Sequence, residues 1–151
     1  MFERFTTPAR DAVTEASRIA RDMGATTIEA EHLLLAVTNT DAPAARVLHD
    51  AGLDDDGLRA ALASETTRSL AAVGVSVDAM HFSPFVKAPK FGSSAKLVLE
   101  RALKVAIARR DKHIGAEHLA LAALQPAVGT VPRALDQAGV DRAALISALS
   151  A

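Results

Sequence analysis

The stretch Ile28–Val37, IEAEHLLLAV, returns near the other end of the chain as Ile114–Ala123, IGAEHLALAA. An isoleucine, an Ala-Glu-His triplet and a leucine-rich run recur in the same order, 86 positions later. A phrase with this many matches in order is unlikely to arise twice by chance, and internal repeats determine the fold of the chains that contain them. The two stretches therefore have to be aligned together with the residues around them.

The same offset of 86 extends toward the N-terminus of each stretch. It places Phe5 on Phe91, Ala9 on Ala95, Val13 on Leu99, Ala16 on Ala102 and Ala20 on Ala106. After one inserted residue the register resumes, with LHDAGLD from Leu48 matched to LDQAGVD from Leu135. The alignment indicates a tandem duplication, with repeat one at residues 1–63, an inter-repeat segment at 64–90 and repeat two at 91–151.

Each repeat reads as four short helices. Thr7 is a good N-cap with Pro8 in the first helical position, and apolar residues at 9, 13, 16, 20 and 23 form one stripe that Gly24 ends. A second helix follows Ile28, and a third runs from about Pro43 to Ala51. Asp54 is the expected N-cap of the fourth helix, and Asp141 is its counterpart in repeat two. The first helix of repeat two is expected to run from Ser93 to about Asp111. We expect Leu33, Leu34, Val37, Leu48, Leu119, Leu124 and Leu135 to be buried.

The inter-repeat segment is too apolar for a free linker, since it contains Phe82 and Phe85 beside a glycine and two prolines. We expect it to cross between the repeats and pack partly against them, with a short extended piece around Val73–Val77. A disordered tether is the alternative. The predicted fold is all-α, with eight short helices in two four-helix repeats related by a pseudo-twofold axis.

Composition narrows the class of protein. Half of the 151 residues are hydrophobic, mostly Ala, Leu and Val, and Ala favours helix. No apolar run approaches the roughly eighteen residues that cross a bilayer, and the start MFERFTTPAR lacks the apolar segment of a secretion signal. There is no cysteine, so disulfides and thiolate metal sites are excluded. These features predict a cytoplasmic domain with no membrane partner.

The net charge of −1 divides unevenly along the chain. Residues 1–62 hold six Lys/Arg against eleven Asp/Glu, whereas residues 87–151 hold ten against five. The basic residues 96–112 could attract nucleic acid, but no aromatic side chains interleave for base stacking, so we interpret them as a solvated face. The five histidines are scattered and no HExxH occurs, so we expect no metal, no cofactor and no catalytic residues.

Several phrases together resemble a known family. They are MFERFT, a Pro-Ala-Arg helix start, I-x-x-EHLLL and V-L-x-x-A-G-L, and their pattern is duplicated. This set is similar to the N-terminal Clp repeat domain of Clp-family AAA+ unfoldases, above all those of the ClpC branch. The resemblance covers nearly the whole chain and implies an eight-helix domain that docks substrates and adaptors for a protease-coupled unfoldase. No G-x-x-x-x-G-K-[ST] occurs, so we expect a stand-alone or excised domain without the ATP-driven motor.

The resemblance also implies a ligand, phosphoarginine. By position the family's site maps to Thr6 and Glu31 in repeat one, and to Glu117 in repeat two. A carboxylate suits the guanidinium, while a hydroxyl and free helix N–H groups suit the phosphate. Gly92 replaces the second threonine, with Ser93 as the residue that could compensate. We therefore expect the site of Thr6 and Glu31 to be the stronger one, although the negative field of the first half opposes a phosphate there.

Structural roles compete with these assignments. A glutamate near a helix N-terminus is stabilised by the helix dipole whatever its function, and we expect His32 and His118 to satisfy buried polar groups. Phe2 and Phe5 are typical of a core. The resemblance makes the Phe2 region a peptide-binding surface, with cyclic peptide antibiotics as further ligands. The sequence thus predicts a binding module for Clp components, adaptors and substrates, or alternatively a decoy that sequesters cyclic peptides or phosphoarginine proteins and protects the unfoldase.

Overall fold

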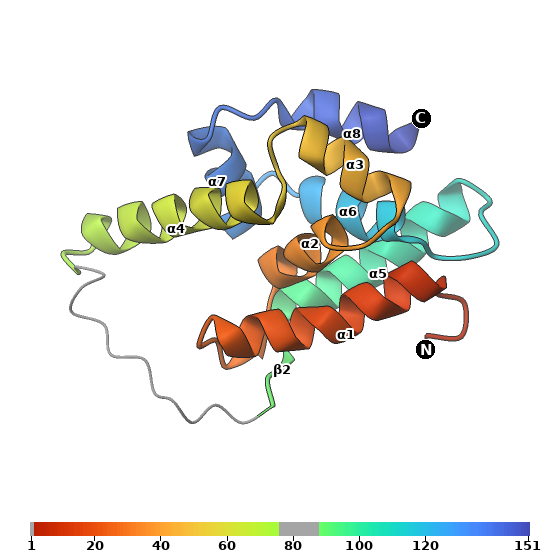
Figure 1. Ribbon diagram of the computed structural model, residues 1–151, viewed down its shortest axis with the longest axis horizontal. Coiled ribbons are helices and arrows are strands. Elements are labelled where there is room, and N and C mark those ends of the chain that lie inside the picture. Colours follow the sequence, from red (N-terminus) through yellow and green to blue (C-terminus); the bar gives the residue numbers. More distant parts are fainter. Residues whose placement is uncertain (1, 76–87) are drawn as a thin grey trace.

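The computed structural model describes residues 2–75 and 88–151. This part of the chain forms eight helices and two very short strands (Figure 1). In chain order they are α1 (Thr7–Asp22), β1 (Thr27–Ile28), α2 (Ala30–Thr38), α3 (Pro43–Asp50), α4 (Asp55–Ala72), β2 (Lys90–Phe91), α5 (Ser93–Ala108), α6 (Ala116–Leu124), α7 (Thr130–Gln137) and α8 (Arg142–Ser150).

The helices of the two halves correspond one to one, which confirms the duplicated all-α fold. α1 and α5 both have 16 residues, α2 and α6 both have 9, and α3 and α7 both have 8. Asp54 and Asp141 cap α4 and α8, each accepting a backbone N–H bond from the residue three positions on. These caps stand where the sequence predicts them because aspartate offers its carboxylate to a free first-turn N–H.

The repeats differ at their fourth helix and at several predicted ends. α4 has 18 residues against 9 for α8, so it runs past the predicted repeat boundary at residue 63 and packs on α7. The N-cap of α1 is Thr6, one residue before the predicted Thr7. α3 ends at Asp50 and α5 at Ala108, earlier than predicted. Val73 caps α4 rather than starting an extended piece; Phe82 and Phe85 lie outside the described residues.

Two backbone pairings cross between the repeats. β1 pairs in parallel with β2, joining Ile28 to Phe91, while an isolated parallel bridge joins Phe5 to Ile114. Because the alignment makes Phe5 equivalent to Phe91 and Ile28 to Ile114, each pairing is the pseudo-twofold image of the other. The residues that precede the first helix of one repeat therefore lie beside those that precede the second helix of the other.

The core forms around α2 and α6, which lie in the middle of the molecule with α1 and α5 along one side (Figure 1). α2 is buried along almost its whole length, and so is α6. All seven predicted core residues are buried, with 0 or 1% of each exposed. Within the described ranges, no helix combines the length and the apolar character needed to span a membrane.

Candidate functional site

The crossed pairings create two equivalent junctions where helix N-termini of different repeats meet. We call the first the α2–α5 junction; it comprises Ile28–Glu31 and Gly92–Ser94. The Gly92 N–H donates to the Ile28 carbonyl over 2.8 Å. The second, the α1–α6 junction, comprises Thr6–Pro8 and Ile114–Glu117, and its Thr6 N–H donates to the Ile114 carbonyl over 2.9 Å. The duplication thus presents the same backbone frame twice, with different side chains.

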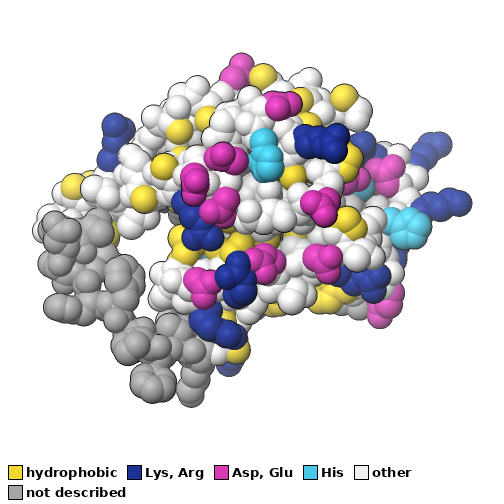
Figure 2. Space-filling model, viewed as in Figure 1, with side chains coloured by type: hydrophobic (Ala, Val, Ile, Leu, Met, Phe, Trp, Pro, Cys, Tyr) yellow, Lys and Arg dark blue, Asp and Glu magenta, His cyan; other side chains and the backbone are white. Residues whose placement is uncertain are grey.

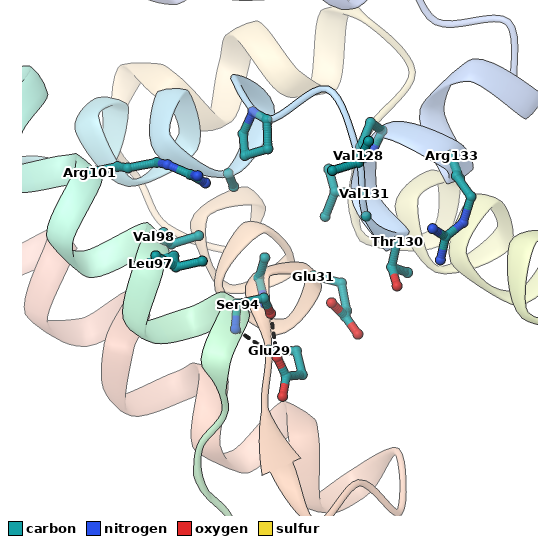
Figure 3. Close-up of a pocket in the computed structure, with 15 residues that line it drawn as sticks. Glu29, Glu31, Ser94, Leu97, Val98, Arg101, Val128, Thr130, Val131 and Arg133 are labelled. Atoms are coloured by element: carbon teal, nitrogen blue, oxygen red, sulfur yellow. Dashed lines mark hydrogen bonds between the residues drawn. The ribbon is translucent and has the colours of Figure 1, made fainter.

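At the α2–α5 junction two helices cap each other (Figure 3). The Glu29 carboxylate accepts bonds from the Ser94 hydroxyl and from the Ser94 N–H at 3.2 Å. In return the Ser94 hydroxyl accepts the Ala30 N–H of α2 over 2.8 Å, and the Thr27 hydroxyl donates to Glu29 at 2.9 Å. A carboxylate at a helix N-terminus is favoured by the dipole and by the free N–H groups there. The protein's own Glu29 therefore occupies the anion position of α5.

Gly92 makes this arrangement possible because it leaves room for Glu29. Its backbone is extended (φ −80°, ψ 176°), a conformation open to any residue. A Cβ at this position would collide with the Glu29 carboxylate, however. The glycine is thus the counterpart of Glu29, and the missing threonine hydroxyl is replaced by a carboxylate from the other repeat. Ser93, the predicted substitute, is exposed as the first residue of α5, and it is Ser94 that bonds to Glu29.

The α1–α6 junction has the reverse composition. Thr6 is the N-cap of α1 and accepts the Ala9 N–H over 3.3 Å, while Gly115 stands where the other junction has Glu29. The Glu117 carboxylate folds back over Gly115, and 40% of that side chain is exposed. Pro8 has no N–H, so Thr7 offers the remaining first-turn donor of α1 that has no partner in the described chain. In the described chain no carboxylate fills the N-terminus of α1 as Glu29 fills that of α5; we call Glu29 the plug of the α2–α5 junction.

These contacts correct the predicted grouping of site residues. By position in the sequence, Thr6 and Glu31 of repeat one are expected to form one site. The structure instead sets Thr6 beside the segment that leads to Glu117, and it sets Ser94 beside the segment that leads to Glu31. The physical reason is the crossing of the strand pairs, which exchanges the helix starts between the repeats.

The two histidines of the repeated phrase are structural, as predicted. The His32 ring accepts the Glu29 N–H over 2.8 Å and the His118 ring accepts the Gly115 N–H over 2.8 Å, both through Nδ1. Burial lowers the pKa of His32, which keeps its ring neutral and able to accept this bond. His118 also bonds through Nε2 to the Asp111 carboxylate at 2.7 Å. Among the residues described, no three His, Cys, Asp or Glu gather as a metal site.

Glu31 differs electrostatically from the acidic residues around it. It lies in the first turn of α2 and is half-buried. Burial raises the pKa of Glu31 above its ordinary value; a hydrogen bond from the Glu31 backbone N–H offsets part of this, and the nearby carboxylates of Glu29 and Glu65 raise the pKa further. Glu65 is held by the Arg133 guanidinium at 2.9 Å, whereas no cation pairs with Glu31 anywhere in residues 2–75 and 88–151. The carboxylate is thus poised to accept a positive charge from outside the chain.

A groove of about 390 Å³ opens beside Glu31 (Figure 3). α5, the N-terminus of α2 and the turn from α6 into α7 enclose it. Its apolar lining includes Leu97, Val98, Pro126, Val128, Val131 and Pro132. Leu97 is 45% and Val128 83% exposed, so the wall offers apolar surface to a partner. In Figure 3, Arg101 lies across the groove from Glu31.

The equivalent groove of repeat one has the opposite character. It measures about 540 Å³ and runs between α1 and the end of α2. Asp11 stands where the other groove has Leu97, and Glu15 stands where it has Arg101. Figure 2 shows acidic side chains over α1, α3 and the start of α4, interspersed with basic ones. Of these two grooves, the repeat-two groove therefore combines an apolar wall with carboxylates at one end.

A family model describes this architecture. The model of the Clp repeat (R) N-terminal domain matches residues 4–88 and again residues 90–151. The chain belongs to the Clp repeat N-terminal domain family. The two matches fall on the two halves of the duplication, which accords with the helix-by-helix correspondence of the fold.

Relatives of this Clp repeat domain are longer proteins. The ClpB 1 chaperone of Synechocystis sp. is 32% identical over 117 residues, which cover 77% of this chain and 12% of that protein. An uncharacterized protein of Mycobacterium tuberculosis is 32% identical over 146 residues, 93% of this chain and 50% of its own length. The chloroplastic ClpC1 chaperone of Arabidopsis thaliana is 31% identical over 142 residues. The chain spans half or less of the length of these relatives.

Solved structures share the fold of this Clp repeat domain. The N-terminal domain of ClpD from Arabidopsis thaliana superposes with a TM-score of 0.73 at 22% identity, covering 99% of this chain and 94% of that one. The Hsp104 N-terminal domain of Candida albicans gives 0.67 at 18% identity, covering 97% and 89%. At these identities the likeness establishes the architecture alone.

Some features of the Clp repeat domain escaped the sequence analysis. The plug residue Glu29 was missed because its partner, Ser94, is 65 positions away. A signal was nonetheless present: each junction pairs one glycine with one polar side chain, Gly92 with Glu29 and Gly115 with Thr6. Phe2 and Phe5 were identified, and their rings meet edge to face at a centroid distance of 5.0 Å. Phe5 is 5% exposed, and Phe2 packs partly buried against the core.

Proposed function

We propose that this Clp repeat domain is a non-enzymatic binding module of the Clp protease system, which takes up substrate segments or adaptor proteins for a Clp unfoldase in the cytoplasm. The observation that carries the proposal is the repeat-two groove, whose exposed Leu97 and Val128 offer apolar surface in a chain of this family. Exposed apolar patches rimmed by charge commonly mark protein-interaction sites. Extended protein segments are the ligands that such a groove suits.

We further propose that phosphoarginine binds at the α1–α6 junction. The exposed part of the Glu117 carboxylate suits the guanidinium. The Thr6 and Thr7 hydroxyls and the Thr7 N–H, at the positive end of the α1 dipole, suit the phosphate. At the α2–α5 junction the Glu29 carboxylate competes for the same place and repels a phosphate. Phosphoarginine binding is therefore assigned to Glu117 with Thr6, and not to Glu31.

Pull-down with the immobilised domain tests the module. The probes are an assembled Clp unfoldase ring and a permanently unfolded model protein, each added alone and then together. Capture of the unfolded protein that is reduced by Val128→Asp supports the groove as the binding surface, and a complex with the ring supports the adaptor role. Capture of ligand without any ring complex would favour the decoy role. If Val128→Asp captured the unfolded protein and the ring as well as wild type does, the groove would not be the binding surface.

A further inference from the structure

We propose that the repeat-two groove selects protein segments that carry one unphosphorylated arginine or lysine next to apolar residues. The inference rests on the proposed function and names the chemistry that this groove reads. It gives the two junctions different roles. The α1–α6 junction would bind the phosphorylated side chain, whereas the groove beside the α2–α5 junction would bind the unmodified cation. The phosphorylated and the unmodified side chain would then be bound at different junctions of one domain.

The first step is the charge at the Glu31 end of the groove. Two carboxylates line this end, and Glu29 is already committed to Ser94 through hydrogen bonds. Arg133, a basic lining residue on α7, is committed to Glu65 at 2.9 Å. Glu31 has no basic partner within residues 2–75 and 88–151, and its carboxylate accepts a hydrogen bond from its own backbone N–H. An entering guanidinium or ammonium would complete a charge-assisted pair there, in a partly desolvated place where such pairs are stronger than at an open surface.

The second step is the discrimination against phosphate. A phosphorylated arginine keeps its guanidinium, but its phosphate would bring about two negative charges toward Glu29 and Glu31. The helix N–H group of Ser94 that could hold a phosphate is used by Glu29. Like charges at such short range disfavour each other, and Arg133, which also lines the groove, is already paired with Glu65. The same plug that closes the junction to an anion therefore favours a plain cation.

The third step is the length and direction of the segment. From Glu31 the wall continues over apolar side chains to Arg101 on α5, which is half-buried and lies across the groove in Figure 3. Arg101 repels a second cation and attracts an acidic side chain. The preferred segment thus has one basic residue, then apolar residues, then an acidic residue. A uniformly basic peptide fits less well because one end of the groove opposes it.

The repeat-one groove provides an internal comparison for this assignment. It has Asp11 in place of Leu97 and Glu15 in place of Arg101, so it lacks both the apolar wall and the cation that sets direction. Glu15 is paired with Arg18 on its own helix. A peptide that depends on apolar contacts next to a single cation is therefore expected to bind one groove per domain.

Fluorescence anisotropy with four short labelled peptides tests the proposal. The parent carries one central arginine, flanking leucine and valine, and a distal glutamate. The other three replace the arginine by phosphoarginine, by norleucine, or the glutamate by lysine. We expect the parent to bind most tightly, with about tenfold weaker binding of the norleucine form. Glu31→Gln should weaken the parent by a similar factor while leaving the norleucine form unchanged. Glu100→Gln, an exposed acidic residue of α5 outside the groove, should have no effect.

Each outcome discriminates. If no peptide binds, the groove is not a peptide site and the proposed function fails there. If the norleucine form binds as well as the parent, the groove is a plain apolar site; the function stands and the cation selectivity is overturned. Tighter binding of the phosphoarginine form, lost in Glu31→Gln, would likewise overturn it. Thermal melts of both variants establish that they fold, so that a loss of binding is a loss of recognition.

Discussion

The α2–α5 and α1–α6 junctions share one backbone frame and differ at four aligned positions, which are Gly92/Thr6, Ser93/Thr7, Ser94/Pro8 and Glu29/Gly115. At the first, Glu29 reaches across to the N-terminus of α5 and Gly92 gives it room. At the second, Thr6 caps its own helix and Gly115 leaves the opposite position without a side chain. The duplication preserved the crossing of the chains, and the side chains at four positions determine whether the protein itself fills the anion position.

The comparison extends to the grooves beside the junctions. One is apolar with Arg101 at an end, and the other is lined by Asp11, Glu15 and Asp41. A duplicated domain can therefore hold a common core while its two surfaces diverge, because exposed positions tolerate substitution and buried ones do not. Substitutions in the shared core should therefore have larger effects on stability than substitutions at the diverged surfaces.

The largest effect is expected from Leu34→Ala. Leu34 is 1% exposed in α2, whereas the equivalent position of α6 is Ala120. The truncation removes buried apolar surface and leaves a cavity, so the free energy of unfolding should fall by about 2–5 kcal/mol. Urea denaturation measures it, and Leu103→Ala, at a position 38% exposed, should cost less than about 1 kcal/mol. An unchanged midpoint for Leu34→Ala would remove this residue from the core.

Alanine at the two histidines should come next. His32→Ala and His118→Ala each leave a backbone N–H of the helix start without its acceptor, at a cost of about 1–3 kcal/mol. His118→Ala should cost more because it also removes the bond to Asp111. His113→Ala is the control, since His113 is exposed. Equal stability of His118→Ala and wild type in a thermal melt would contradict the capping role.

A smaller and more specific effect is expected from Gly92→Ala. The new Cβ displaces the Glu29 carboxylate, so the cap of α5 is lost at about 1 kcal/mol. In a Glu29→Ala background the same substitution should cost close to nothing, because the displaced group is already absent. At the glycine of the other junction, the Cβ added by Gly115→Ala meets only the partly exposed carboxylate of Glu117, which can turn outward.

Chemical denaturation of the two single variants and the double variant completes this cycle. A cost that is the same with and without Glu29 would show that Gly92 is required for some reason other than the room it gives to the plug.

The smallest effect has the opposite sign. Burial raises the pKa of Glu31, so its ionised form lowers the stability of the free domain at pH 7. A raised folded-state pKa means that this penalty is full above the folded value and vanishes below the unfolded value, about 4.5. Glu31→Gln should therefore raise the free energy of unfolding at pH 7, and by much less at pH 4. Urea titrations at both pH values decide this, and a destabilised variant at pH 7 would show that Glu31 has a partner in the free protein.

Much of the frame is predictable from the sequence, because local rules determine it. The EH phrase, the aspartate caps and the leucine periodicity predict eight helices and the seven buried residues correctly. The crossing of the strand pairs is not predictable, since residues 86 apart look alike and either copy could pair with either partner. For the same reason the sequence groups Thr6 with Glu31, although the structure sets Thr6 beside the segment that leads to Glu117. Gly92 was read as a lost hydroxyl because a side chain reaching from Glu29 depends on contacts distant in sequence.

The central claim is that one junction is plugged and the other is open to an anion. Isothermal titration of the domain with free phosphoarginine tests it most directly, on wild type, Glu117→Gln and Glu31→Gln. Glu117→Gln should remove a charge-assisted bond worth about 1.5–3 kcal/mol, a loss of about ten- to a hundredfold in affinity, whereas Glu31→Gln should bind phosphoarginine like wild type. Weakening by Glu31→Gln that equals or exceeds that of Glu117→Gln would contradict it.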